Sequence, residues 1–225
     1  MGSERRAPER TRQYEVVTDR PYDLVLFDLG GVLIELSGVG AMQELTGIGS
    51  DDELWERWLT CPWVRAFERG ECSAEEFAQG MVADWEFSVE PESFLDAFRE
   101  WPVGPLPGAE ALVARVAEVV AVGCLSNTNI LHTEERFSRW AIFDAFEPRL
   151  LSYELGVLKP DRVLFDRVAE LVGSPPSRIL FLDDNLINVD GATAAGFAAV
   201  HVRGVTEAEQ ALEAAGILDA SRGPA

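Results

Sequence analysis

The chain has 225 residues, of which 47% are hydrophobic and 26% are charged, so it can form one domain with an insertion or two unequal domains. This composition excludes collagen-like, coiled-coil and disordered proteins. The formal net charge of −20 repels phosphodiester backbones and anionic lipids, so we expect neither nucleic acid nor membrane as a partner.

The N-terminal segment, residues 1–20, interleaves five arginines with acidic residues and has no apolar stretch. It predicts a flexible arm and not a secretory signal. Elsewhere, no apolar run approaches the roughly 20 residues that span a bilayer. The three cysteines, Cys61, Cys72 and Cys124, form no CxxC pair and are odd in number, which argues against disulfides and structural zinc. A cytoplasmic location fits this use of cysteine.

Four short apolar runs end abruptly at polar residues or glycines, as strands buried on both faces of a parallel sheet do. They cover residues 24–27, 119–125, 179–182 and 198–202. Amphipathic patterns predict helices over residues 107–118, 161–172 and 186–195. Strand and helix alternate from about residue 106 onward, which indicates βαβ units in an α/β fold.

A long helical insertion separates the first two predicted strands, because the gap exceeds what one crossover helix needs. Helices are expected over residues 52–59 and 92–99, and Ser73 to Glu76 has the pattern of a capping box. Glycine and prolines at 102–107 mark the return hinge, and residues 36–40 mark the outgoing one. We therefore expect a catalytic core formed by residues 21–36 and 106–220, and a helical cap formed by residues 37–105.

Polar residues follow three of the predicted strands. Asp28 ends the first strand, Ser126 and Asn127 end the second, and Asp183 and Asp184 end a later one. Ligands of open α/β sheets bind beyond the carboxyl ends of the strands, so these five side chains are expected to gather at one edge. Each of them alone is also a common turn or helix-capping residue. Together they predict a functional site.

Lys159 is the only lysine in a chain that otherwise uses arginine, with 18 of them, for positive charge. Its retention indicates a site that needs a compact ammonium instead of a planar guanidinium. Alternatively, this one lysine is retained by chance. Near clustered carboxylates, this lysine would offset their mutual repulsion and attract an anionic substrate.

In this order, the runs FDLGGVL, LSNTN, KP and FLDDN resemble the four signature motifs of the haloacid dehalogenase-like hydrolase superfamily. The resemblance spans residues 22 to about 203. The runs AFERG and LSNTNILH are most similar to the branch that contains a bacterial α-D-glucose-1-phosphate phosphatase. The resemblance implies a Rossmann-like parallel sheet with helices on both faces, and a small helical cap inserted after the first strand that closes over the active site.

The resemblance also implies roles for the motif residues. Asp28 is the expected nucleophile, which attacks phosphorus to form an aspartyl-phosphate. The Ser126 hydroxyl and the Asn127 backbone N–H are expected to bind the phosphoryl group, beside the N-terminus of the following helix. Lys159 is expected to bridge the nucleophile and the phosphate and to balance charge in the transition state.

A Mg²⁺ cofactor is implied as well, since this hard cation prefers carboxylate and phosphate oxygens. Asp28 and Asp184 are the expected metal ligands, together with the backbone carbonyl of Gly30. Asp183 is a further metal candidate, either as a ligand or as a support for one. Asn188 is expected to orient the metal-bound waters or the lysine.

One position departs from the family pattern. Most phosphatases of this superfamily have an aspartate two residues after the nucleophile that acts as general acid and base, but this chain has Gly30. Loss of such a group costs about 10²- to 10⁴-fold in rate. The glucose-1-phosphate phosphatase branch resembles this chain in having glycine there, and a sugar 1-phosphate has a comparatively good leaving group.

Other residues are candidates for contact with the substrate. His132 is expected near the active edge, as a substrate-binding group or as a capping or surface residue. Glu68 and Arg69 in the predicted cap either contact substrate or are solvated. The aromatic residues of the insertion are expected mainly to form the core of the cap, with one or two free to stack on a sugar ring. They are Trp55, Trp58, Trp63, Phe67, Trp85 and Trp101.

These observations predict a Mg²⁺-dependent phosphomonoester hydrolase for a small phosphorylated metabolite, with a sugar phosphate expected ahead of a nucleotide. One alternative is a metal-independent 2-haloacid dehalogenase, because such relatives also lack the second aspartate of the first motif. They carry neutral residues, however, where this chain has Asp183 and Asp184. Another alternative is a catalytically silent protein that binds a phosphate ligand.

Overall fold

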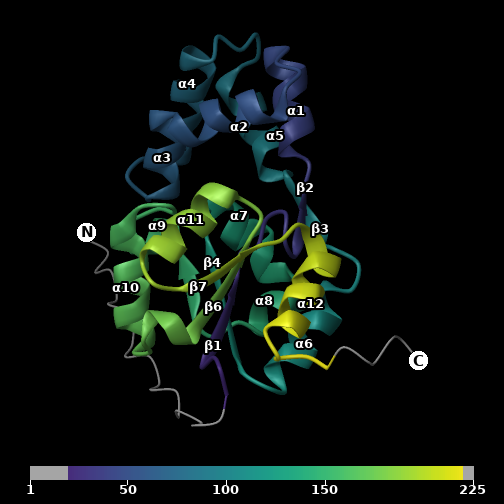
Figure 1. Cartoon of the computed structure of the whole chain (residues 1–225). Helices are drawn as coiled ribbons and strands as arrows, with labels where there is room; N and C mark the ends of the chain where they lie inside the picture. Colours follow the sequence, from purple (N-terminus) through teal and green to yellow (C-terminus); the bar gives the residue numbers. More distant parts are fainter. Residues whose placement is uncertain (1–19, 220–225) are drawn as a thin grey trace, which may run out of the picture.

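The computed structural model describes residues 20–219, which form a five-stranded parallel sheet with helices on both faces and a second, helical part above it (Figure 1). Residues 1–19 of the predicted N-terminal arm lie outside the described part of the chain. The strand order is β5-β4-β1-β6-β7, with neighbouring strands parallel throughout. The predicted α/β fold is confirmed.

The strands of this sheet are β1 (Leu24–Phe27), β4 (Ala121–Ser126), β5 (Arg149–Leu151), β6 (Ile179–Asp183) and β7 (Ala198–His201). The helices around it are α6 (Ala109–Ala117), α7 (Ile130–Glu135), α8 (Ala141–Asp144), α9 (Ser152–Leu155), α10 (Arg162–Val172), α11 (Leu186–Ala194) and α12 (Gly204–Ala214). Short 3₁₀ helices lie at Phe137–Arg139 and Pro176–Arg178. Four of the five strands were predicted from their apolar runs, whereas β5 was missed.

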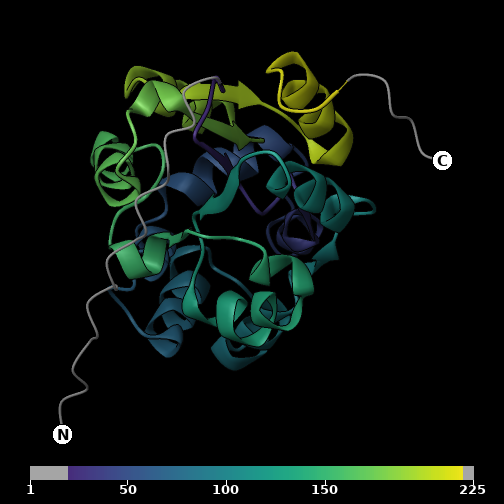
Figure 2. The same ribbon diagram turned by 90° about the horizontal axis from the view of Figure 1, so that it is seen from below.

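The sheet separates two hydrophobic cores, because successive side chains of a strand point to opposite faces. Val25 and Phe27 of β1 pack with α6, α8 and α12, whereas Leu24 and Leu26 pack with α10 and α11. Figures 1 and 2 show these two groups of helices on opposite sides of the sheet. Burial on both faces explains why β1 is an unbroken apolar run rather than an alternating one.

The register of the central strand sets the position of the polar residues that follow it. Phe27 pairs with Cys124 of β4 on one side and with Leu182 of β6 on the other. The next residue, Asp28, therefore emerges at the same level as the ends of both neighbouring strands. Its backbone N–H donates to the carbonyl of Leu182 at 2.8 Å, which holds the end of β1 against β6.

The helical cap consists of five helices between β1 and β4. They are α1 (Gly38–Thr46), α2 (Asp51–Thr60), α3 (Pro62–Glu68), α4 (Ala74–Asp84) and α5 (Pro91–Arg99). The chain enters and leaves the cap through two antiparallel strands, β2 (Ile34–Leu36) and β3 (Pro102–Pro105). The predicted return hinge, residues 102–107, contains β3, whereas the predicted outgoing hinge, residues 36–40, overlaps β2 only at Leu36. The pairing of the two strands was not predicted. The predicted capping box at Ser73 and Glu76 opens α4 and is confirmed.

An aromatic cluster forms the core of the cap, as expected for a small module with few other ways to bury area. Phe98 lies at its centre and packs against Trp58, Phe77 and Trp101, with ring centroids 4.8–6.3 Å apart. Trp55 and Trp63 remain 39% and 37% exposed, so not every aromatic residue of the insertion joins this core. In the described part of the chain, the helices are too short or too polar to cross a membrane.

Candidate active site

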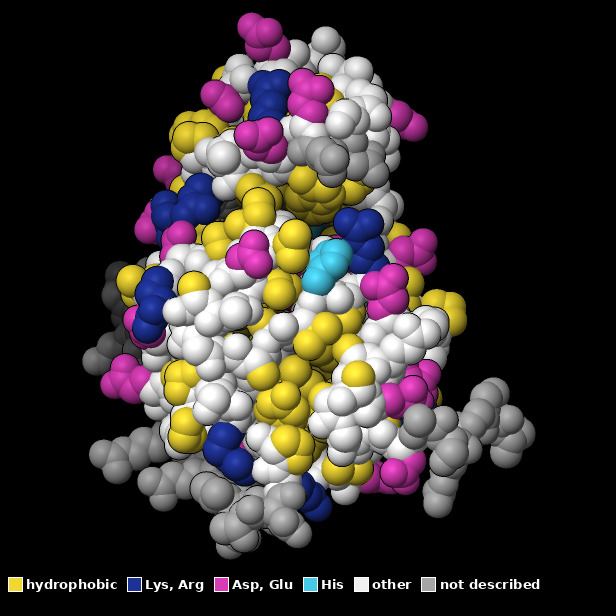
Figure 3. Space-filling view, in the orientation of Figure 1, with side chains coloured by type: hydrophobic (Ala, Val, Ile, Leu, Met, Phe, Trp, Pro, Cys, Tyr) yellow, Lys and Arg dark blue, Asp and Glu magenta, His cyan; other side chains and the backbone are white. Residues whose placement is uncertain are grey.

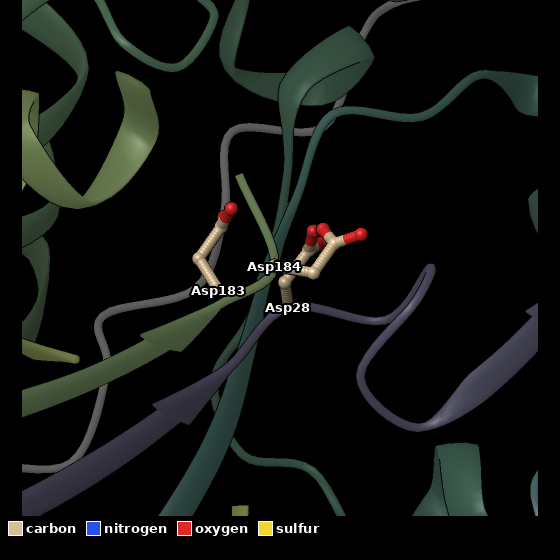
Figure 4. A group of neighbouring side chains, drawn as sticks. All are labelled: Asp28, Asp183 and Asp184. Carbon is tan, nitrogen blue, oxygen red and sulfur yellow. The ribbon is translucent and has the colours of Figure 1, made fainter. Parts of the chain in front are cut away.

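Three carboxylates meet at the carboxyl edge of the sheet, where the sequence predicted a site. Asp28 follows β1, and Asp183 and Asp184 close β6; one oxygen of each lies within 4.8 Å of the others. Figure 4 shows the carboxyl groups of Asp28 and Asp184 close together, with Asp183 to one side. Strand ends alone bring these groups together, because β1 and β6 are adjacent and parallel.

A glycine allows one of these carboxylates to approach the loop that follows β1. A Cβ added to Gly31 would lie 2.1 Å from Oδ2 of Asp184, so only glycine leaves room for this side chain. Gly31 also has a φ of +71°, which L-residues with a side chain rarely adopt. Asp184 thus lies directly against the loop that begins at Asp28.

Lys159 lies under the carboxylates and is almost fully buried, with 1% of its surface exposed. Its Nζ is 2.6 Å from Oδ2 of Asp183, 3.0 Å from Oδ1 of Asp28 and 3.1 Å from the carbonyl oxygen of Leu125. An ammonium has three N–H donors, so each donor has one acceptor. Burial opposes the charge, but Asp183 and Asp28 outweigh burial and raise the pKa of Lys159, which keeps it cationic.

Hydrogen bonds from the loop after β4 hold the lysine in place. The Asn127 side chain donates to the carbonyl of Lys159 at 3.0 Å and accepts from its backbone N–H at 2.9 Å. Ser152 fixes the same loop, since its hydroxyl donates to the carbonyl of Thr128 and accepts from the Thr128 N–H. Ser152 lies on α9 outside the motifs, so no sequence pattern pointed to it.

Two further oxygens at this edge are available to a ligand. The Ser126 hydroxyl forms no hydrogen bond with any described residue, although its side chain is 4% exposed. The carbonyl oxygen of Gly30 likewise accepts no hydrogen bond within residues 20–219. Buried polar groups are normally paired, so both are suited to bind a ligand or an ion.

Burial raises the pKa values of the two carboxyl groups nearest the cleft. The pKa of Asp28 rises to about 7, because desolvation and the repulsion of Asp183 and Asp184 exceed the attraction of Lys159. The pKa of Asp184 rises to about 6, through burial and the repulsion of Asp183. At neutral pH the site therefore holds more negative charge than one lysine balances, which favours a bound cation. The oxygen donors present fit a hard cation such as Mg²⁺.

Asp183 is held by hydrogen bonds at both of its carboxylate oxygens. Its Oδ2 accepts from Lys159, and its Oδ1 accepts from the backbone N–H of Asn185 at 2.8 Å. The amide of Asn188 donates to both oxygens, at 3.0 and 3.2 Å. Asn188 thus orients the Asp183 carboxylate toward Lys159, and Asp183 remains a candidate metal ligand together with Asp28 and Asp184.

His132 does not lie in the cleft, which argues against its predicted role in substrate binding. Its Nε2 lies 2.7 Å from the carbonyl oxygen of Phe98 and its Nδ1 lies 3.2 Å from the Asn129 amide. The ring stacks on Phe98 at a centroid distance of 4.3 Å. Burial lowers the pKa of His132 to about 4, so the ring is neutral at physiological pH. His132 joins α7 of the core to α5 of the cap.

The entrance to the site lies between the cap and the core. Figure 3 shows that the molecule narrows there and that hydrophobic side chains gather along the narrowing. Leu36 ends β2 and is 39% exposed, and Leu186 and Ile187 begin α11 and are each 56% exposed. From the cap side, the half-buried Glu68 interacts electrostatically with Lys159 and Asp28. The mouth therefore combines apolar surface with one acidic group.

A model of the haloacid dehalogenase-like hydrolase family matches residues 22–196. Among relatives, pyrimidine 5'-nucleotidase YjjG from Escherichia coli is 26% identical over 176 residues, which cover 72% of this chain and 77% of that protein. D-ribitol-5-phosphate phosphatase from Bacteroides thetaiotaomicron is 26% identical over 185 residues, which cover 77% and 88% of the two chains.

A similar fold is found in a solved structure of the HAD family enzyme BT-2542 from Bacteroides thetaiotaomicron, a complex with magnesium and inorganic phosphate. The TM-score is 0.66 at 27% identity, and the match covers 81% of this chain and 94% of that one. The residues matched by the family model include α1–α5 and all the polar residues described above. The similarity therefore extends over both the sheet and the cap.

Proposed function

The chain belongs to the haloacid dehalogenase-like hydrolase family, and on that basis we propose that it is a Mg²⁺-dependent phosphomonoester hydrolase that works through an aspartyl-phosphate. The observation that carries this proposal is the buried Lys159 ammonium between Asp28 and Asp183, with Asp184 alongside. This arrangement presents a carboxylate nucleophile, a fixed cation and a metal-binding carboxylate to one cleft.

Asp28 is proposed as the nucleophile. Its Oδ1 accepts from the Leu29 N–H at 2.7 Å and pairs with Lys159, whereas Oδ2 has no hydrogen bond from the described residues. Oδ2 is thus the oxygen that attacks phosphorus. Lys159 holds the carboxylate in this orientation and balances the charge that develops on the phosphoryl group.

The phosphoryl group is proposed to bind at the end of β4. The free hydroxyl of Ser126 and the backbone N–H of Asn127 are the donors, and Asn127 at the same time ties the loop to Lys159 through its side chain. Asp28, Asp184 and the Gly30 carbonyl are proposed to hold Mg²⁺. Bound Mg²⁺ supplies charge neutralisation and orientation at the phosphoryl oxygens.

The substrate is proposed to be a small phosphorylated metabolite, and a sugar phosphate in particular. The relatives named above act, by their names, on a nucleotide and on an alditol phosphate. Dehalogenation without metal is disfavoured, because Asp28 and Asp184 both have raised pKa values and would repel each other without a cation.

The test is a panel of sugar phosphates, nucleotides and an aryl phosphate, assayed with Mg²⁺ and with excess EDTA. We expect phosphate release that needs Mg²⁺, is absent in Asp28→Asn, and is fastest for a sugar phosphate. Release of halide from 2-haloacids in EDTA would instead establish a dehalogenase. Phosphate binding by the wild type without any turnover above Asp28→Asn would establish a binding protein.

A further inference from the structure

The loop after the nucleophile has no side chain that can transfer a proton. Gly30 lies two residues beyond Asp28, and a Cβ added there would lie 2.6 Å from Cδ1 of Leu36. The Leu36 side chain thus covers the face on which a side chain at position 30 would stand. A methyl group neither donates nor accepts a proton, so the leaving oxygen must obtain its proton elsewhere.

Apart from Asp184, which is proposed to hold Mg²⁺, the other titratable groups around Asp28 are committed. All three donors of Lys159 are on protein oxygens, and Asp183 already accepts hydrogen bonds at both oxygens. His132 is turned away, with both ring nitrogens on protein partners. Burial raises the pKa of the Cys124 thiol to about 12, so it does not exchange protons at neutral pH.

Glu68 is held in place by cap-to-core contacts on both sides of it. It ends α3, and three residues earlier Arg65 pairs at 3.1 Å with Asp161 of the core. Two residues later, a Cβ on Gly70 would lie 2.7 Å from the carbonyl oxygen of Tyr153 on α9. Glu68 therefore lies where the cap touches the core, close to the loop that contains the catalytic lysine.

The carboxyl group of Glu68 has no hydrogen-bond or ion-pair partner among the described residues. It nevertheless interacts electrostatically with Lys159 and Asp28. An unpaired, half-buried carboxyl group is costly to maintain, which is a property of groups that serve a ligand.

We propose that Glu68 is the general acid and base of this active site; the proposal rests on the phosphatase function described above. As Oδ2 of Asp28 bonds to phosphorus, the P–O ester bond breaks and the leaving oxygen takes the proton of the Glu68 carboxylic acid. The resulting carboxylate then accepts a proton from the water that attacks the aspartyl-phosphate. This second step releases inorganic phosphate and restores both carboxyl groups.

The electrostatic surroundings of Glu68 agree with this role. Burial raises its pKa to about 7, with a further contribution from Asp28, and the attraction of Lys159 and Arg65 offsets this only in part. Those three are the charged groups that act on the carboxyl within the described chain. A carboxyl group that titrates near pH 7 can both donate and accept a proton at neutral pH.

The test compares Glu68→Gln and Glu68→Asp with wild type on two esters, glycerol phosphate and 4-nitrophenyl phosphate. Glu75→Gln, an exposed glutamate on α4 of the same cap, is the matched control. We expect Glu68→Gln to lower kcat for glycerol phosphate about 10²- to 10⁴-fold, and Glu68→Asp to restore part of it. Nitrophenolate leaves without a proton, so its single-turnover release stays near the wild-type rate while steady-state turnover slows and phosphoenzyme accumulates.

The pH profile gives a second readout. Wild-type kcat on glycerol phosphate should fall as Glu68 loses its proton above pH 7, and Glu68→Gln should lack this alkaline limb. The role of Glu68 is overturned if wild type turns over both esters and Glu68→Gln changes their single-turnover cleavage rates by the same factor. An equal loss on both esters through KM alone also overturns it. Absence of turnover in wild type instead overturns the phosphatase function itself.

A gain-of-function variant keeps the proposal testable if Glu68→Gln folds poorly. Gly30→Asp combined with Leu36→Ala introduces a carboxyl group on the nucleophile loop and removes the side chain that obstructs it. Added to Glu68→Asp, this pair should raise kcat for glycerol phosphate at least tenfold relative to Glu68→Asp alone. If the combined variant folds but its kcat for glycerol phosphate does not rise, then lack of a proton donor is not what limits the reaction.

Discussion

The acidic side chains at the strand ends oppose folding when no metal is bound. Asp28 is 8% exposed, and its pKa of about 7 in the folded chain lies well above the ordinary value of 3.8. Above pH 7 the folded protein therefore holds a buried charge that the unfolded chain leaves in water. This cost shrinks progressively as the pH falls from about 7 toward 3.8, because the folded carboxyl takes up a proton before the unfolded one does.

Replacing Asp28, the proposed nucleophile, should accordingly stabilise the Mg²⁺-free protein. Asp28→Asn keeps the shape of the side chain and removes its charge, so we expect the thermal midpoint at pH 8 to rise by at least ~2 °C while turnover is lost. At pH 5 the gain should be much smaller. Differential scanning calorimetry with EDTA measures it, with the exposed Asp190→Asn as control. A lower midpoint at pH 8 would contradict the assignment of a costly buried charge.

At the residue scale, the sequence predicted where the backbone places each residue better than it predicted where each side chain points. Asp28, Asp184 and Lys159 meet as expected, because strand ends and the order of βα units fix their backbone. His132 was misjudged because the rotation of α7 aims it at Phe98, and a single sequence does not contain that rotation. The hydrogen bond from the Asn127 side chain to the Lys159 carbonyl was missed for the same reason.

At the element scale, predictability followed the length of the apolar run. Strands covered on both faces were found from their apolar runs, and α4 from its capping box. The edge strand β5 has three residues, too few to show a period, and β3 begins and ends with proline, which normally argues against a strand. Both are edge or ribbon strands, where proline and short length are tolerated because few ladder bonds are required.

The contact between α7 and α5 should make stability depend on pH through His132. Its folded pKa of about 4 lies below the ordinary 6.5, so the unfolded chain binds the proton more readily between these values. The stabilising contribution is thus present above pH 6.5 and is lost as the pH falls toward 4, by up to about 3 kcal/mol.

Urea unfolding of wild type and His132→Phe from pH 4 to 7 isolates this contribution, because the phenyl ring keeps the stacking on Phe98 but cannot titrate. Wild type should be the more stable protein at pH 7, where it retains two hydrogen bonds, and should lose that advantage toward pH 4. A difference in the free energy of unfolding that stays constant with pH would show that the ring titrates normally in the folded state.

At the scale of the whole molecule, the net charge of −20 acts against a phosphorylated substrate. Lys159 attracts the phosphate only at short range, whereas the surface field repels a dianion over the screening length of the solution. Salt shortens that length from about 30 Å at 0.01 M to about 8 Å at 0.15 M. We therefore expect kcat/KM for a phosphate monoester to rise about threefold over this range.

Steady-state rates at constant free Mg²⁺ and increasing NaCl measure this effect. The saturated rate, kcat, should change little, because the bound ester is already past the repulsive surface. A kcat/KM that falls with salt would mean that local positive charge, and not the overall acidity, governs the approach of the substrate.

The paired strands β2 and β3 place the start and the finish of the insertion side by side, with Glu35 opposite Gly104. The five-stranded sheet uses neither of them, since β1 bonds directly to β4 and β6. Everything from α1 to α5 is therefore a cassette with both connections at one point. Evolution, or a protein engineer, can therefore exchange this insertion for another one. Such an exchange would alter substrate selectivity and leave the five-stranded sheet and its active site unchanged.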